Sequence, residues 1–202
     1  MLSLLLYGLL AVVRAAPSQA DVDDVDGPGI PGTTVSPIFW HVRAFPDGPT
    51  LTLNGTLQEM HKRLLEINPN YEADFNRTAV ATRSLEARTD FTGAEYNCLT
   101  QVWGSVNKKG YDEAVPYLQK HDGTPHMLPG PRVCGRVSCS YNTAVWMCND
   151  ATDDQYLINW SSVADGIQYI WSKCAPDPYL NPSGGQVFHY TNWNVVLRDA
   201  SC

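Results

Sequence analysis

Six cysteines, all of them after residue 97, constrain the fold of this chain more than any other feature of its sequence. They are Cys98, Cys134, Cys139, Cys148, Cys174 and Cys202. An even number of cysteines in an exported chain predicts three disulfides, because the oxidising environment outside the cell keeps such bonds closed. A zinc site usually needs closely spaced pairs such as C-x2-C, and the closest pair here, Cys134 and Cys139, is spaced more widely. We therefore predict three disulfides and no metal or other cofactor.

The start of the chain predicts export. Residues 2–13 form an apolar run that is shorter than the roughly 20 residues needed to cross a membrane, and Arg14 interrupts it. Small residues follow the run, as they do at the cleavage region of a signal peptide. A signal anchor is the alternative, because the leader lacks the usual positive charge at its beginning. We predict a signal peptide over residues 1–20, a secreted, extracellular protein and no stable membrane insertion.

The charge of the chain narrows the range of partners. Its formal net charge is -7 and its pI is about 5.1. A phosphate backbone attracts Lys and Arg and repels a negative field, so we expect no nucleic-acid partner. The same sign of charge disfavours binding to an anionic membrane through charge alone.

Three sequons fit an exported chain. Asn54, Asn76 and Asn159 each begin an Asn-x-Ser/Thr motif. Each of these side chains is a candidate for glycosylation in a eukaryotic secretory pathway.

Residues 21–93 differ in composition from the cysteine-bearing part of the chain. Residues 21–35 are acidic and rich in Gly and Pro, which predicts a linker or part of a pro-segment. A helix is expected to begin after Thr56, because Thr56 and Glu59 can form a capping box and apolar residues then recur on one face. The segment 21–93 is therefore interpreted as an acidic linker with a helical arm on the main domain, or as a pro-region.

Residues 94–202 predict a disulfide-stabilised α/β sandwich of the α+β class. The pattern of apolar residues and turn signals gives the order β-α-β-β-α-β. This order is typical of a split β-α-β fold, with two helices on one face of an antiparallel sheet whose strand order is 4-1-3-2. The expected elements are strand 97–104, helix 112–121, strands 135–141 and 144–149, helix 162–174 with a capping box from Ser162 and Asp165, and strand 186–198.

This topology favours one disulfide pairing among the 15 that six cysteines allow. Cysteines that fall on the same edge of the sheet can approach closely enough to bond. The favoured pairs are Cys139–Cys174, Cys98–Cys202 and Cys134–Cys148. The alternative keeps the first pair and exchanges the other two for Cys98–Cys148 and Cys134–Cys202.

No residue of the chain carries a recognisable catalytic motif. The sequence has no G-x-S-x-G, no H-E-x-x-H and no phosphate-binding glycine loop. His189 could act as a general base, although a structural histidine is the commoner case in a strand. Asp150, Asp153, Asp154 or Asp165 could supply paired carboxylates, and the acidic loop that holds the first three could form a loose Ca²⁺ site, although a solvated loop is commoner. Two aromatic residues in polar surroundings, Trp160 and Tyr179, are expected to be exposed and are weak binding candidates together with His189.

Several blocks of sequence resemble a large group of small secreted, cysteine-containing proteins of filamentous fungi, which are often regarded as candidate effectors. The blocks are 134–150 (CGRVSCSYNTAVWMCND), 164–167 (ADGI), 184–188 (GGQVF) and 192–196 (NWNVV). The architecture is similar to the α/β sandwich of virus-encoded fungal killer toxins. The resemblance implies a secreted, non-enzymatic binding protein, an effector or toxin-like protein with a role in virulence and a host protein or cell-wall glycan as partner. A small extracellular hydrolase and a sugar-binding module are the alternatives.

Overall fold

A computed structural model describes residues 27–75, 88–121, 123–175 and 182–202. The predicted leader, Asn76 and Tyr179 lie outside these ranges. The described residues form a mixed α+β structure with two sheets and three disulfides, which confirms the predicted fold class at this level.

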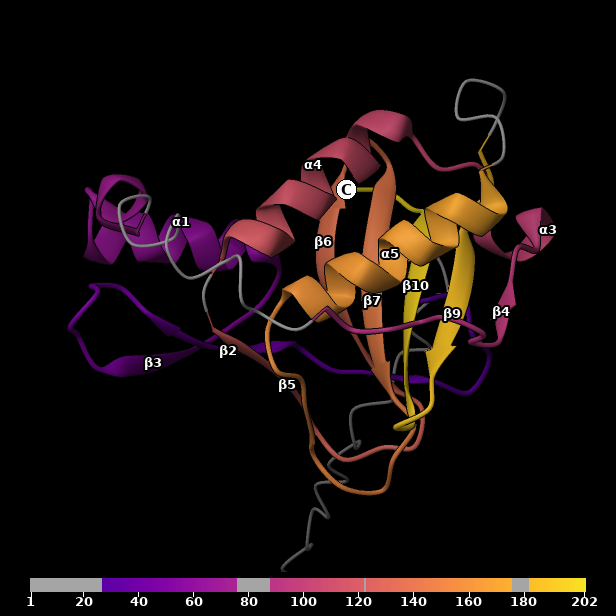
Figure 1. Cartoon of the computed structure of the whole chain (residues 1–202), viewed down its shortest axis with the longest axis horizontal. Coiled ribbons are helices and arrows are strands. Elements are labelled where there is room, and N and C mark those ends of the chain that lie inside the picture. The colour runs from indigo at the N-terminus through magenta and orange to yellow at the C-terminus, as the bar shows by residue number, and fades with distance from the viewer. Residues whose placement is uncertain (1–26, 76–87, 122, 176–181) are drawn as a thin grey trace, which may run out of the picture.

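The larger sheet has six strands, and two helices cover one of its faces (Figure 1). The helices α4 (Lys108–Lys120) and α5 (Ser161–Cys174) pack against each other and against the sheet. In order across the sheet, the strands are β1 (Thr34–Val35), β6 (Val133–Ser140), β7 (Thr143–Asn149), β10 (Trp193–Asp199), β9 (Gly185–His189) and β4 (Tyr96–Asn97).

The predicted strand order 4-1-3-2 is not confirmed. The strand before α4 is only the two-residue β4 at the edge of the sheet, and the chain then turns into the short helix α3 (Thr100–Trp103). The predicted last strand is a hairpin of β9 and β10, in which His189 pairs with Trp193. Asn192 adopts a positive φ of 58° in the turn, a conformation that Asn tolerates better than most residues. The alternation of apolar residues runs through both strands, so it conceals this turn.

The two long helices both begin earlier than predicted, α4 at Lys108 and α5 at Ser161. Helix α4 begins at Lys108 because the Asn107 side chain accepts a hydrogen bond from the Lys109 N–H at 2.9 Å. The predicted capping box of Ser162 and Asp165 is wrong. The Asn159 amide oxygen caps α5 by accepting from the Ser162 N–H at 3.2 Å, while the Asp165 carboxylate accepts from the Thr89 N–H at 2.8 Å.

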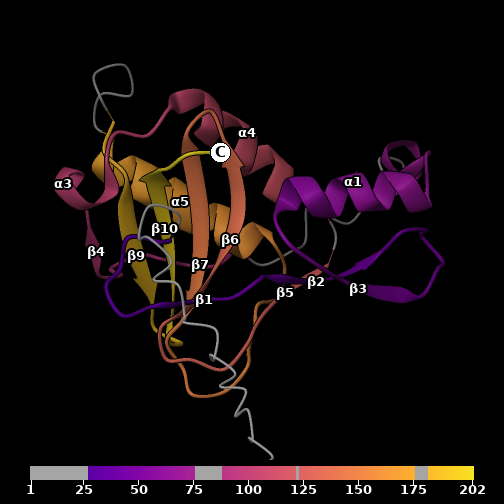
Figure 2. The same cartoon turned by 180° about the vertical axis from the view of Figure 1, so that it is seen from behind.

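A second sheet of four strands lies beside the first, with α1 (Leu57–Ile67) at its side (Figures 1 and 2). The predicted capping box of Thr56 and Glu59 at the start of α1 is confirmed. The four strands were not predicted, because each is short and they come from distant parts of the chain. In order across the sheet, they are β3 (Thr50–Asn54), β2 (Phe39–Arg43), β5 (Thr124–Met127) and β8 (Gln155–Tyr156).

One hydrophobic core joins the two sheets. Trp40 of β2 is fully buried and stacks on Trp160, which precedes α5, with ring centroids 3.4 Å apart. The core also contains Met60 and Leu64 of α1. The inner face of the small sheet is therefore fixed against the main body, and only its outer face meets solvent.

Three disulfides cross-link the main body, and one of the favoured pairs is correct. Cys134–Cys148 is confirmed, but the other two bonds join Cys98 to Cys174 and Cys139 to Cys202. The error follows from the strand order. Because β4 lies at the edge beside β9, Cys98 approaches the end of α5. Because β10 ends beside the turn between β6 and β7, where Ala200 N–H donates to Asn142 O, the C-terminus meets Cys139.

Candidate functional site

The outer face of the small sheet carries a group of aromatic and polar side chains. Strand residues alternate between the two faces of a sheet. In β2, Trp40 and Val42 are buried while Phe39 and His41 are half-buried on the other face. In β5 and β8, His126 and Tyr156 continue the same outer face and are directly paired. We call the surface formed by Phe39, His41, Thr52, His126, Asp154 and Tyr156 the ring face.

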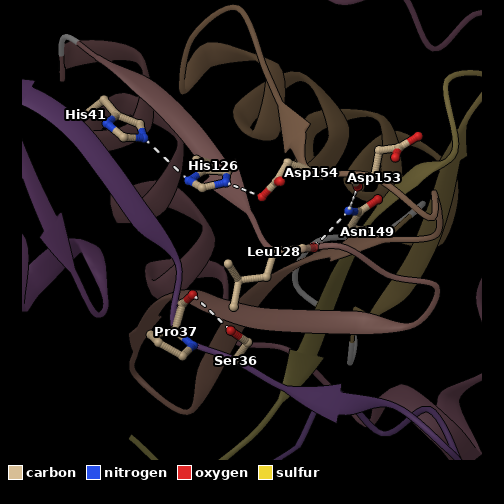
Figure 3. Close-up of polar contacts among 8 residues, drawn as sticks. All are labelled: Ser36, Pro37, His41, His126, Leu128, Asn149, Asp153 and Asp154. Carbon is tan, nitrogen blue, oxygen red and sulfur yellow. Dashed lines mark hydrogen bonds and ion pairs between the residues drawn. The ribbon is translucent and has the colours of Figure 1, made fainter.

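A chain of hydrogen bonds crosses the ring face from strand β3 to the loop before β8. The Asp154 carboxylate can only accept, so His126 donates its Nε2–H to Asp154 Oδ1 at 2.7 Å. In the neutral ring His126 Nδ1 is then an acceptor, which receives the Nε2–H of His41 at 3.4 Å. His41 Nδ1 in turn accepts the hydroxyl hydrogen of Thr52 at 3.1 Å. Figure 3 shows the two imidazoles with facing nitrogens and Asp154 on the far side of His126.

Asn149 fixes the loop that presents Asp154. This side chain is fully buried at the end of β7, where its amide nitrogen donates to Leu128 O and Asp153 O at 2.9 and 2.7 Å. Its amide oxygen accepts from the Ala151 N–H. As a result Asp154 points toward His126, while the side chain of Asp153 points away from it (Figure 3).

Tyr156 lies flat against His126. Their ring centroids are 4.2 Å apart and the interplanar angle is 3°. Tyr156 is nevertheless 55% exposed, whereas the His126 side chain beneath it is 14% exposed. The tyrosine ring is therefore presented to solvent on a rigid support.

A pocket of about 330 Å³ lies elsewhere on the molecule, between α1 and α4. Its lining consists of Leu57, Gln58, His61, Glu113, Ala114, Tyr117 and Ser138. Two polar side chains on its wall are hydrogen-bonded to each other, since Gln58 donates to Ser138 Oγ at 3.0 Å. The pocket is large enough for a small ligand, and Glu113 is the one acidic side chain in its lining.

His61, which lines this pocket, pairs with His121. His121 donates its Nδ1–H to Tyr117 O at 2.9 Å, so His61 Nδ1 donates to His121 Nε2 at 3.1 Å. His61 Nε2 lies 3.4 Å from Glu72, which also forms an ion pair with Lys120. Burial, and then the charge of Lys120, lower the pKa of His61 below its usual value. Both nitrogens of His61 therefore face protein groups rather than the pocket.

Of the predicted site candidates, the structure describes Trp160 and His189. Trp160 is fully buried, so its expected exposure is wrong. His189 lies in the β9–β10 hairpin, where Nδ1 contacts Thr191 Oγ1 at 2.7 Å and the ring packs on Trp193. Burial lowers the pKa of His189, against the opposing charge of Asp90.

Two of the three sequons are described, and their asparagines differ in exposure. Asn54 is exposed at the end of β3 and its amide oxygen accepts from Arg63 Nη1 at 3.1 Å. Asn159 is only 7% exposed because it caps α5. The fold therefore leaves room for a glycan at Asn54 and encloses the side chain of Asn159.

Sequence reasoning missed both histidines of the ring face. The signal that could have revealed them is the alternation in FWHVR at 39–43, which puts Trp40 and Val42 on one face and His41 on the other. His126 has no comparable signal, since β5 (TPHM) is short and contains a proline.

The residues that the structure describes contain no helix that is both long and apolar enough to cross a membrane. In the same ranges, no three His, Cys, Asp or Glu side chains converge as a metal-binding group.

Comparison of the chain with models of protein families, with curated proteins and with solved structures gives no match.

Proposed function

We propose that the chain is a secreted, non-enzymatic binding protein of the fungal effector or toxin-like kind, and that it binds a cell-wall glycan through the ring face. Export rests on the leader 1–20, and the three disulfides suit a protein that works outside the cell. The structural support for binding lies in how the rings of this face are held.

The observation that carries the proposal is the supported, exposed ring of Tyr156. Binding costs less when the groups that make contact are already fixed, because little side-chain entropy is lost. His126 holds one side of the Tyr156 ring, and the hydrogen bond from His126 to Asp154 fixes the imidazole in turn. The exposed tyrosine can therefore stack on the apolar face of a sugar ring without first becoming ordered.

The surroundings of Tyr156 favour a glycan over a protein partner. Protein interfaces are centred on apolar residues from which charge is depleted. The ring face instead mixes aromatic rings with hydroxyl, imidazole and carboxylate groups, in particular Thr52, His41 and Asp154. Such groups can hydrogen-bond the hydroxyls of a sugar beside the stacked ring.

The hydrolase alternative has less support. It requires two or more of His189, Tyr190 and the acidic residues to converge in one concave pocket, and neither His189 nor Tyr190 lines the pocket between α1 and α4. Tyr190 projects into solvent with 84% of its surface exposed.

A sedimentation assay with insoluble polysaccharides tests the proposal. The mature protein is mixed with chitin, β-1,3-glucan or cellulose, and the bound fraction is measured. We expect retention on at least one polysaccharide, and Tyr156→Ala should bind about 3- to 10-fold more weakly, as loss of one aromatic contact predicts. Tyr190→Ala is the matched control, because this exposed tyrosine lies on another part of the surface. Failure of the wild type to bind any of the three, or equal binding by both variants, would refute the glycan proposal.

A further inference from the structure

We propose that His41 and His126 form an open binding site for a divalent transition-metal ion, and that Zn²⁺ fits it best. The site uses two facing imidazole nitrogens of the ring face, His41 Nε2 and His126 Nδ1. It does not depend on the glycan proposal, because it makes a separate statement about the chemistry of these two rings.

The separation of the two nitrogens matches the geometry of zinc. His41 Nε2 and His126 Nδ1 are 3.4 Å apart. Two nitrogens at 2.0–2.1 Å from a tetrahedral ion are about 3.3–3.4 Å apart, whereas a 90° angle would bring them to about 2.9 Å. The ion would lie to one side of the line joining the nitrogens, so binding requires the two rings to tilt from their hydrogen-bonded orientation until both lone pairs face it.

The second nitrogen of each ring already has an oxygen partner, as in known metal sites. Histidine ligands usually donate their other N–H to a carboxylate or another oxygen, which fixes the tautomer and the orientation of the ring. His126 Nε2–H donates to Asp154 Oδ1 at 2.7 Å, and the Nδ1 of His41 lies 3.1 Å from Thr52 Oγ1.

Binding changes the tautomer of only one ring. When an ion takes His41 Nε2, the hydrogen of that ring moves to Nδ1 and is donated to Thr52 Oγ1. His126 keeps the tautomer that Asp154 imposes, so its Nδ1 is available as a ligand in the free protein.

Asp154 supplies a negative charge beside this histidine pair, whereas two opposite charges, Glu72 and Lys120, lie beside the other pair. The Asp154 carboxylate contacts His126, and Arg43, which follows along β2, donates its Nη1–H to Pro46 O at 2.8 Å. At the other pair, His121 is 5% exposed and the charge of Lys120 lowers the pKa of His61.

The protein supplies two ligands, and water completes the coordination. No third His, Cys, Asp or Glu side chain joins such a group anywhere in the described ranges. The site should therefore bind more weakly than a structural zinc site with four protein ligands, and its open positions could accept oxygen atoms of a bound molecule.

Metal titration of the mature protein tests this inference. Zn²⁺ is titrated in competition with a chromogenic chelator, and Co²⁺ is used as a probe because its visible spectrum distinguishes tetrahedral from octahedral coordination. We expect one ion per chain and a tetrahedral Co²⁺ spectrum. His41→Gln and His126→Gln should each abolish binding, and Asp154→Asn should weaken it about 10- to 100-fold.

His61→Gln is the matched control, because it removes one imidazole from the other pair and should leave the affinity unchanged. NMR signals of the imidazoles in the wild type give a readout that does not depend on whether variants fold: those of His41 and His126 should shift on adding Zn²⁺, and those of His189 should not. Absence of binding by the wild type, or loss of binding in His61→Gln but not in His41→Gln, would overturn the assignment.

Discussion

At the scale of single residues, the aromatic side chains divide into a buried and a displayed set in a way that local sequence does not reveal. Trp160 lies in a sequon beside an acidic loop, surroundings that predict exposure, yet it is fully buried against Trp40. Tyr156, only four residues earlier, is half exposed. The difference arises because Trp160 meets a strand from a distant part of the chain, and no pattern near residue 160 encodes that contact.

This division predicts that Trp160 stabilises the fold and does not contact a ligand. Trp160→Ala removes a fully buried ring and should lower the free energy of unfolding by about 3–5 kcal/mol, measured by urea denaturation with the disulfides intact. Tyr190→Ala, at an exposed site, should change it by less than about 0.5 kcal/mol. A Trp160→Ala protein of unchanged stability would contradict the core packing.

At the scale of elements, the sequence pattern predicted helices and caps that depend on neighbouring residues. It did not predict elements that depend on contacts between distant parts of the chain. The capping box of α1 and the presence of α4 and α5 follow from residues close together in sequence. The predicted capping box of α5 was wrong because Asp165, which suits such a box, instead accepts a hydrogen bond from Thr89. The small sheet was missed altogether, because β2 and β5 pair across more than 80 residues.

The contact between α1 and α4 predicts that acid destabilises the fold. The ordinary pKa of His61 is 6.5, and burial and Lys120 lower it in the folded protein. Below pH 6.5 the unfolded chain therefore binds more protons at His61 than the folded chain does, so stability falls as the pH decreases through this range. The midpoint of urea unfolding, measured between about pH 7.5 and about pH 5, should decrease, and it should decrease less in His61→Gln.

Lys120→Met provides an independent check on the cause. Removing this charge should raise the pKa of His61 toward its ordinary value and so reduce the loss of stability on acidification. An identical pH dependence in the wild type and both variants would show that His61 is not responsible.

At the scale of the whole molecule, the order of the strands in the large sheet determines which cysteines form disulfides. The number of bonds and the Cys134–Cys148 pair, which closes neighbouring strands, were predictable from a hairpin. The partners of Cys98 and Cys139 depend on strand order, which six short strands with similar alternation do not specify. The candidate site was likewise not predictable, because the ring face combines residues from distant segments of the chain. These segments are β2, β3, β5, and β8 with the loop before it.

The three disulfides should differ in their resistance to reduction. Cys202 is exposed at the C-terminus, whereas Cys134 and Cys148 are fully buried behind the sheet. Accessible disulfides exchange faster with external thiols. Brief treatment with a low concentration of reductant, followed by alkylation and peptide mapping, should therefore find Cys139 and Cys202 labelled first and Cys134 and Cys148 last. Labelling of Cys134 before Cys202, or a connectivity that differs from these pairs, would contradict the fold.

The most direct test of binding through the ring face is an NMR titration of the mature, isotopically labelled protein with a short chitin or β-1,3-glucan oligosaccharide. We expect chemical-shift changes to gather on Tyr156, His126, His41 and their neighbours in β2, β5 and β8, and Tyr156→Ala to reduce them. Shifts gathered around Tyr117 between α1 and α4, or no shifts with either oligosaccharide, would contradict a glycan-binding surface on the small sheet.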